Sequence, residues 1–283
     1  SKAIPLSYAQ QRLWLLHQID GHSAQYNEFS AQHISGSLNI EALKVAIDCL
    51  IERHEVLRTC FSSLDGVPYQ KFGGAEQLFF QCTDFSVEDN ALDSDEKLNQ
   101  LATLAEEESL FPFDLEFGPL VRVHIYKLSD EQTVLFINMH HIICDGWSTA
   151  VFVTELLSLY QGAIDKKHVQ LKPLRIQYAD FAAWEREHLK SDTLDNGLNY
   201  WESQLRGAPP LLNLPTDRAR PSTQRYRGGS LSFVIDKAQS ARLNQFCLET
   251  TSTPFMVLLS AYSLLLSRYS GQQDVVIGTP VAN

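Results

Sequence analysis

One apolar run constrains the fold of this chain more than any other feature, because two histidines and a glycine turn follow it. Residues 134–139 read VLFINM, a β-prone run with the length of a buried strand, and His140 and His141 come directly after it. Side chains alternate along a strand, so the two histidines face opposite sides and only one can meet a reaction centre. We expect the other histidine to be packed or hydrogen-bonded inside the fold.

The residues after the histidines favour an acyl-transfer site. Gly146 permits a tight turn, and the apolar periodicity of residues 147–160 predicts a helix whose N-terminus lies beside the histidines. Backbone N–H groups there could stabilise a developing oxyanion. Asp145 is a solvated turn residue, a helix cap or the partner of an arginine that fixes the loop. No third ligand stands at a zinc-like spacing, so no metal site is expected.

The pattern of the first 206 residues predicts alternating helices and strands. Segments 120–128 and 133–141 are strand-like and flank the turn at 129–131, which predicts an antiparallel hairpin that carries the histidines. The acidic triplet 106–108 is interpreted as a solvated helix face. A short strand is expected near 58–62, and helices are expected over 8–19, 40–51, 94–110, 148–161, 177–189 and 193–205.

A proline-rich stretch from Gly207 to Gly229 interrupts this alternation. It holds four prolines and a basic run, which argue against regular structure and predict an exposed linker between an N-terminal lobe over 1–206 and the beginning of a second lobe over 230–283. Within the second lobe, the pattern predicts strands over 230–235 and 274–277 and helices over 238–250 and 254–269.

Composition excludes several classes of function. The formal net charge is −11, from 23 Lys and Arg against 34 Asp and Glu, so a nucleic-acid partner is not expected. The longest strongly apolar segment, 255–266, is too short to span a bilayer, and no secretory signal pattern stands at the start. Five scattered cysteines, an odd number, indicate reduced thiols and a cytoplasmic location.

Several motifs, in order along the chain, resemble those of the condensation domains of nonribosomal peptide synthetases. The segment MHHIICDGWS at 139–148 contains the HHxxxDG pattern in full. The other similar segments are LSYAQQRLWLL at 6–16, RHEVLRTCF at 53–61, YADFAAW at 178–184, LPTDRARP followed by YRGG within 214–229, and IGTPVAN at 277–283. Ordered motifs over the whole length are far more specific than any one of them.

The resemblance implies an α/β fold of the chloramphenicol-acetyltransferase type, with two lobes arranged as a V and the active site at their junction. The domains of this family continue past the motif in which residue 283 lies. The resemblance therefore implies a C-terminally truncated domain, with a complete N-terminal lobe and a partial second lobe. We do not expect turnover by such a fragment alone.

The implied reaction is amide formation between a donor aminoacyl or peptidyl thioester and the α-amine of an acceptor aminoacyl thioester. His141 would act as base or positioning group, His140 would pack inward, and the backbone near Gly146 would stabilise the oxyanion. Asp145 would pair with Arg58, with Arg53 as the second choice. The domain itself would bind no cofactor or metal. Its substrates would arrive on the phosphopantetheine of upstream and downstream carrier proteins, beside neighbouring synthetase domains.

Three functions are compatible with the sequence. Besides condensation, the chain could be a related HHxxxDG acyltransferase or an epimerase-like domain, or a noncatalytic module that docks a carrier protein or a tailoring enzyme. The opening motif and LPTDRARP favour condensation. The opening motif is also more similar to domains that join two L-configured residues.

Overall fold

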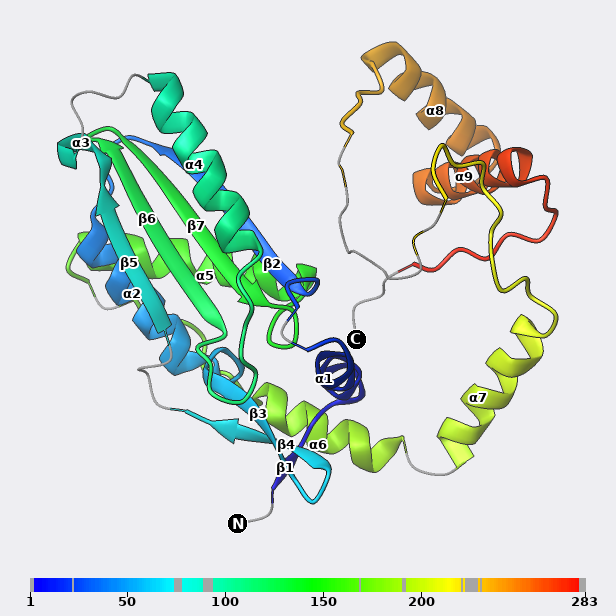
Figure 1. The fold of residues 1–283 in the computed structure, drawn as a ribbon, viewed down its shortest axis with the longest axis horizontal. Helices are drawn as coiled ribbons and strands as arrows, with labels where there is room; N and C mark the ends of the chain where they lie inside the picture. The colour runs from blue at the N-terminus through cyan, green and yellow to red at the C-terminus, as the bar shows by residue number, and fades with distance from the viewer. Residues whose placement is uncertain are drawn as a thin grey trace. The chain divides into compact units, whose positions relative to one another are not determined.

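The computed structural model describes residues 3–21, 23–73, 78–88, 94–167, 169–189, 192–219, 221, 229 and 231–279 (Figure 1). The chain divides into two compact units, Ser1–Thr193 and Leu194–Asn283. This division falls ahead of the linker expected at 207–229, and the assignment of 1–206 and 230–283 to two lobes stays a prediction.

A four-stranded sheet forms the centre of the first unit, and its order is β2-β7-β6-β5. The strands are β2 (Asn27–Ser35), β5 (Leu78–Asp84), β6 (Val121–Ser129) and β7 (Gln132–His140). Both neighbours of β7 run antiparallel to it, whereas β5 and β6 are parallel. The predicted hairpin is therefore confirmed as β6 and β7, which pair from Val121 opposite Met139 to Ser129 opposite Gln132.

One face of this sheet is covered by two helices, α2 (Ile40–Arg53) and α5 (Gly146–Ile164), which pack against each other (Figure 1). Because side chains alternate on a strand, every second residue of β6 and β7 points to this face and joins the main apolar core. The sheet residues in that core are Val121, Val123, Ile125, Leu135, Ile137 and Met139. The HHxxxDG segment begins at the end of β7, and its residues Ile142, Ile143 and Cys144 belong to this core.

The opposite face of the sheet is covered by α4 (Ser94–Ser109), which packs on β2 and β7 (Figure 1). A small apolar cluster there includes Leu101 of α4 and Phe136 of β7. Beside it lies Glu108, which is 7% exposed. The interpretation of residues 106–108 as a solvated face is wrong for Glu108, because the phase of α4 turns this residue toward the sheet.

Glu108 is held by charged and polar partners on the sheet. Arg122 Nε donates to Glu108 Oε1 over 2.7 Å, and His124 Nε2 lies 2.9 Å from Glu108 Oε2. The Arg122 guanidinium lies 4.1 Å and 3.7 Å from the ring centroids of Phe79 and Phe111. Burial alone would raise the pKa of Glu108, but the hydrogen bonds from His124 and Arg122 lower it to about 2. This cluster fastens the end of α4 to β6.

The remaining elements of the first unit lie around both ends of the four-stranded sheet (Figure 1). They are α1 (Tyr8–Asp20), the 3-10 helix η1 (Glu55–Arg58), α3 (Phe85–Glu88), α6 (Tyr178–His188) and a small antiparallel sheet β1-β4-β3 of Ile4–Pro5, Val67–Phe72 and Thr59–Leu64. The expected helix starts are confirmed: Ser7 and Gln10 form a capping box for α1, and Asn39 caps α2. α6 contacts β1, η1 and α1.

The second unit contains three helices among its described residues, α7 (Asp192–Leu205), α8 (Lys237–Glu249) and α9 (Pro254–Ser270). All three were predicted. The strands predicted over 230–235 and 274–277 are wrong for the described residues 231–235 and 274–277, which form no strand. A β-prone sequence becomes a strand only where a neighbouring strand accepts its hydrogen bonds, and none pairs with these segments in the described structure.

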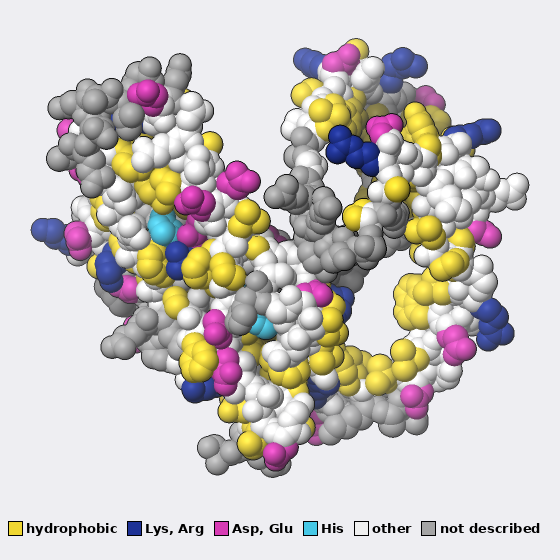
Figure 2. Space-filling view, viewed as in Figure 1, with side chains coloured by type: hydrophobic (Ala, Val, Ile, Leu, Met, Phe, Trp, Pro, Cys, Tyr) yellow, Lys and Arg dark blue, Asp and Glu magenta, His cyan; other side chains and the backbone are white. Residues whose placement is uncertain are grey.

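Apolar side chains are exposed on the surface of this unit, where Figure 2 shows them in yellow. Examples are Leu231, Phe233, Phe255 and Leu264. Within the described part of the whole chain, no helix is both long enough and apolar enough to cross a membrane.

The Glu108 cluster predicts a defined pH dependence of stability. Because the folded state holds the pKa of Glu108 at about 2, below its ordinary value of 4.5, its stabilisation is full above pH 4.5 and is lost as the pH falls toward 2. At pH 7 we expect Glu108→Gln to lower the free energy of unfolding by roughly 1–3 kcal/mol. Urea titrations from pH 7 to pH 3 test this, with the exposed Glu106→Gln as control. Equal stability of the two variants would contradict the role of the cluster.

Candidate active site

The two histidines lie where β7 leaves the sheet. His140 is the last residue of β7 and faces Asn27 of β2, and the His141 N–H donates to the Tyr26 carbonyl over 2.7 Å. The pairing with β2 therefore continues one residue past the strand. Because of the alternation, His140 lies on the α4 side of the sheet with Asn27, and His141 lies on the α5 side.

His140 is a buried, packed residue, with 1% of its surface exposed. Its ring centroid lies 6.4 Å from those of His17 and Tyr26 and 6.0 Å from that of Phe113. The backbone N–H of Ile142 donates to His140 Nδ1 over 3.1 Å. Burial above all, together with the nearby His17 and His141, lowers the pKa of His140 to about 3. The ring is therefore neutral near pH 7, and its position agrees with the inward packing expected from the alternation.

His141 lies in a different environment. Its side chain is 35% exposed, but its Nδ1 atom is closed off from solvent. The Glu28 carboxylate of β2 lies 3.1 Å from that nitrogen. Glu28 was not among the residues expected at the site, because the register of β2 with β7 brings it there and β2 was not predicted. His141 is thus the histidine whose ring is accessible at this end of the sheet.

The turn between His141 and α5 is filled by buried residues. Ile142, Ile143 and Cys144 are all less than 10% exposed. Burial raises the pKa of the Cys144 thiol far above its ordinary value, and Glu28 and Asp145 raise it further. A protonated thiol at this position is a poor nucleophile, so the site has no thiolate for a covalent acyl-enzyme at Cys144.

Gly146 is the first residue of α5 and does not have the positive φ that a strained turn requires. A side chain at this position would meet nothing within 4 Å. The backbone conformation at this position therefore does not require a glycine. The glycine leaves the N-terminus of α5 uncovered, where the first backbone N–H groups of the helix have no intrahelical partner.

Asp145 caps α5. The Ser148 N–H donates to Asp145 Oδ1 over 2.7 Å, and the Asp145 N–H donates to Ser148 Oγ over 2.7 Å. The predicted pairing of Asp145 with Arg58 is wrong. In the described structure Asp145 makes no ion pair with Arg58 or Arg53, and Arg58 Nη2 lies 3.9 Å from Glu55 Oε1 in its own 3-10 helix. The orphan N–H groups of α5 are closer partners for the carboxylate than any arginine.

Comparison with known proteins shows the family of the chain. The family described as "Condensation domain" matches residues 1–283. The chain belongs to the condensation-domain family. Among curated relatives, it is 40% identical to tyrocidine synthase 3 of Brevibacillus parabrevis over 278 residues, which are 98% of this chain and 4% of that protein. It is 38% identical to phosphinothricin tripeptide synthetase PhsC of Streptomyces viridochromogenes, over 99% of this chain and 25% of that protein.

Solved structures support the same fold. The X-domain from teicoplanin biosynthesis matches with a TM-score of 0.79 and 27% identity over 95% of this chain and 58% of its own. The first condensation domain of the CDA synthetase matches with a TM-score of 0.75 and 20% identity, over 97% and 64%. The predicted α/β fold of the chloramphenicol-acetyltransferase type is thereby confirmed. The chain spans about three fifths of the solved domains and a small fraction of the curated synthetases.

The opening motif of this condensation domain contacts the HHxxxDG turn through a hydrogen bond. Gln10 is 2% exposed, and its side-chain N–H donates to the Ile142 carbonyl over 3.4 Å. The Ser7 and Tyr178 hydroxyl groups lie 3.0 Å apart, so the YADFAAW motif of α6 meets the opening motif of α1. The opening motif therefore contacts the turn through Gln10, and the YADFAAW motif, about 170 residues away in sequence, contacts the opening motif through Ser7.

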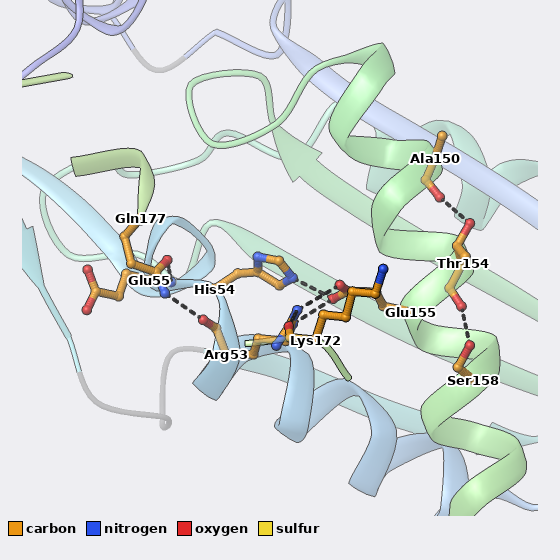
Figure 3. A network of polar contacts seen from close by, with 9 residues as sticks. All are labelled: Arg53, His54, Glu55, Ala150, Thr154, Glu155, Ser158, Lys172 and Gln177. Atoms are coloured by element: carbon orange, nitrogen blue, oxygen red, sulfur yellow. Dashed lines mark hydrogen bonds and ion pairs between the residues drawn. The ribbon is translucent and has the colours of Figure 1, made fainter. Parts of the chain in front are cut away.

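The RHE segment of the second motif builds a polar network around Glu155 of α5 (Figure 3). Arg53 donates to both Glu155 oxygens over 3.0 Å and 3.2 Å, and His54 Nε2 lies 2.7 Å from Glu155 Oε2. Arg53 also donates to the Lys172 carbonyl, and the Gln177 side chain donates to the Arg53 carbonyl. The network joins α2, α5 and the segment before α6.

The charge on Glu155 is stabilised by this network. Burial would raise the pKa of Glu155, but hydrogen bonds from His54 and Arg53 lower it overall. The sequence contained a signal for this contact, since Glu155 is the one charged residue in segment 146–164, which forms α5. The described residues contain no cluster of three or more His, Cys, Asp or Glu side chains arranged to hold a metal ion.

The cap geometry separates two of the roles considered for Asp145, the helix cap and the partner of an arginine. If Asp145 caps α5, we expect Asp145→Ala to lower the free energy of unfolding by about 1 kcal/mol and Asp145→Asn to change it little, because asparagine caps equally well. Thermal and urea unfolding measure both variants. An ion pair would instead make the asparagine variant as unstable as the alanine variant.

Removal of the Glu155 carboxylate leaves Arg53 and His54 without their acceptor. We expect Glu155→Ala to lower the free energy of unfolding by roughly 1–3 kcal/mol. The matched control is Asp48→Ala, which breaks the exposed Lys44–Asp48 pair and should cost less than about 1 kcal/mol. If both variants lose the same stability in urea titrations, the network has no special role.

Proposed function

We propose that the chain forms the peptide bond in a nonribosomal peptide synthetase, by joining a carrier-bound donor aminoacyl or peptidyl thioester to the α-amine of a carrier-bound acceptor. The observation that carries the proposal is the contrast between the two histidines within an intact HHxxxDG segment. His140 is buried and neutral, whereas the His141 side chain is 35% exposed and lies five residues before Gly146, where α5 begins.

The chemistry needs little more than orientation and one proton transfer. The α-amine of the acceptor has an ordinary pKa near ~8, so a useful fraction is neutral at cellular pH. Its nitrogen attacks the thioester carbonyl, the C–N bond forms, and the C–S bond breaks with its electron pair leaving on sulfur. The nitrogen gives up one proton to His141, which passes it to the departing thiolate. General-base help of this kind is worth about 10²–10⁴ in rate.

The negative charge on the carbonyl oxygen would be stabilised at the start of α5. Asp145 already satisfies the Ser148 N–H, which leaves the N–H groups of Gly146 and Trp147 for the oxyanion. The absence of a side chain at Gly146 lets the substrate approach this backbone closely. These groups are fixed by the helix before the substrate arrives.

The proposed partners follow from the same chemistry. Donor and acceptor would be presented by upstream and downstream carrier proteins on phosphopantetheine arms, with neighbouring synthetase domains alongside and a cytoplasmic location. The domain would bind no cofactor of its own. The family membership and the synthetases among the relatives support this proposal.

His141→Ala tests the proposed role. We expect this variant, assayed within its natural protein, to form the amide about 10²- to 10⁴-fold more slowly than the wild type. Its unfolding midpoint should stay near that of the wild type. The assay detects dipeptide on the acceptor carrier by mass spectrometry, with defined donor and acceptor thioesters. His33→Ala, an exposed histidine on β2, is the control. Near-normal product formation by His141→Ala would refute the assignment.

A further inference from the structure

We infer that Glu28 is the positioning residue of His141, which it holds with Nδ1 protonated so that Nε2 is free to accept the proton. This inference rests on the proposed function for what Nε2 does, but the state of the imidazole can be tested without it. The observation is the Glu28 Oε1 to His141 Nδ1 distance of 3.1 Å.

The register of the sheet brings these two residues together. Glu28 of β2 pairs with Met139 of β7, and the His141 N–H bonds to Tyr26, two residues before Glu28. Directly paired residues point to the same face, and so do residues two apart on one strand. Glu28, Met139 and His141 therefore share the face covered by α5, and Glu28 and His141 are diagonal neighbours on it.

The environment of Nδ1 argues that this contact is a constraint on the ring. That nitrogen is closed off from solvent and, among the described residues, has no hydrogen-bond partner of good angular geometry, while the carboxylate of Glu28 lies within reach. Burying a nitrogen lone pair against a carboxylate is unfavourable, and burying an N–H there is favourable. The neutral ring should therefore keep its proton on Nδ1.

A charged residue on an edge strand has a simpler explanation, because edge strands often carry charges that prevent aggregation. That explanation requires only a charge on the strand, and it does not require a carboxylate 3.1 Å from a histidine nitrogen. The other ionisable groups that interact with the pair are His140, through His141, and Cys144, through Glu28. The first is neutral and the second is a buried thiol, so neither replaces the carboxylate.

A carboxylate in this arrangement does two things for a base. It selects the tautomer, and it stabilises the imidazolium that forms when Nε2 takes a proton. Glu28 reaches Nδ1 only, so it touches none of the reacting atoms and acts through His141.

The first test is spectroscopic. Nitrogen-15 spectra of the imidazoles, recorded at a pH where the rings are neutral, report which nitrogen is protonated, and the His141 signals are assigned by their loss in His141→Gln. In the wild type we expect the Nδ1–H form of His141 to dominate. Glu28→Ala should shift the population toward the Nε2–H form, and Glu28→Gln, which keeps an acceptor oxygen, should retain most of the wild-type population. Gln32→Ala, on the same strand and face, should change nothing.

The second test is kinetic and uses the dipeptide assay on carriers. We expect Glu28→Ala to lower kcat by about 10- to 100-fold with little change in KM, and Glu28→Gln to recover part of that loss. A dominant Nε2–H form in the wild type, or unchanged His141 signals in Glu28→Ala, would overturn the inference. Loss of activity in His141→Ala without any effect of Glu28→Ala would also overturn it while leaving the proposed function intact. If His141→Ala had normal activity and Glu28→Ala showed the expected tautomer change, the proposed function would be refuted and the inference about Glu28 would stand.

Discussion

The pairing of β7 with a strand on each side is the constraint on which the rest of the first unit depends. β6 and β2 fix the phase of β7, and this phase determines which side each residue faces. His140 is thereby committed to the side of α4 and His141 to the side of α5. The different burial of two adjacent histidines is thus a property of the sheet, and it needs no special feature of either side chain.

The surroundings of the HHxxxDG turn keep that geometry rigid. Gln10 holds the Ile142 carbonyl, Asp145 closes the first turn of α5, and the Glu155 network fastens α5 to α2. Each of these contacts satisfies a backbone group or a charge that would otherwise be costly to bury. The positions of the groups around the turn are therefore determined by the fold itself.

The local parts of this structure could be predicted from the sequence, and the parts that depend on distant partners could not. The β6–β7 hairpin, the caps of α1 and α2 and the helices of the second unit follow from periodicity and nearby polar residues. β2 could not be recognised, because an edge strand with the sequence NEFSAQHIS has no clean apolar alternation. The Asp145–Arg58 pair was wrong for a related reason. An ion pair depends on tertiary distances, whereas the cap that forms instead depends on Ser148, three residues away.

The edge position of β2 has a consequence for how this protein tolerates change. Asn27 and Glu28 are consecutive, and they serve opposite faces of the sheet. A slip of β2 by one residue would exchange them, placing an amide beside His141 and a carboxylate in the closed aromatic surroundings of His140. The segment between α1 and β2 is a surface connection of the kind that usually accepts insertions and deletions freely. Here an insertion or deletion that displaced β2 by one residue would change which side chain faces each histidine, while leaving every residue of the HHxxxDG segment in place.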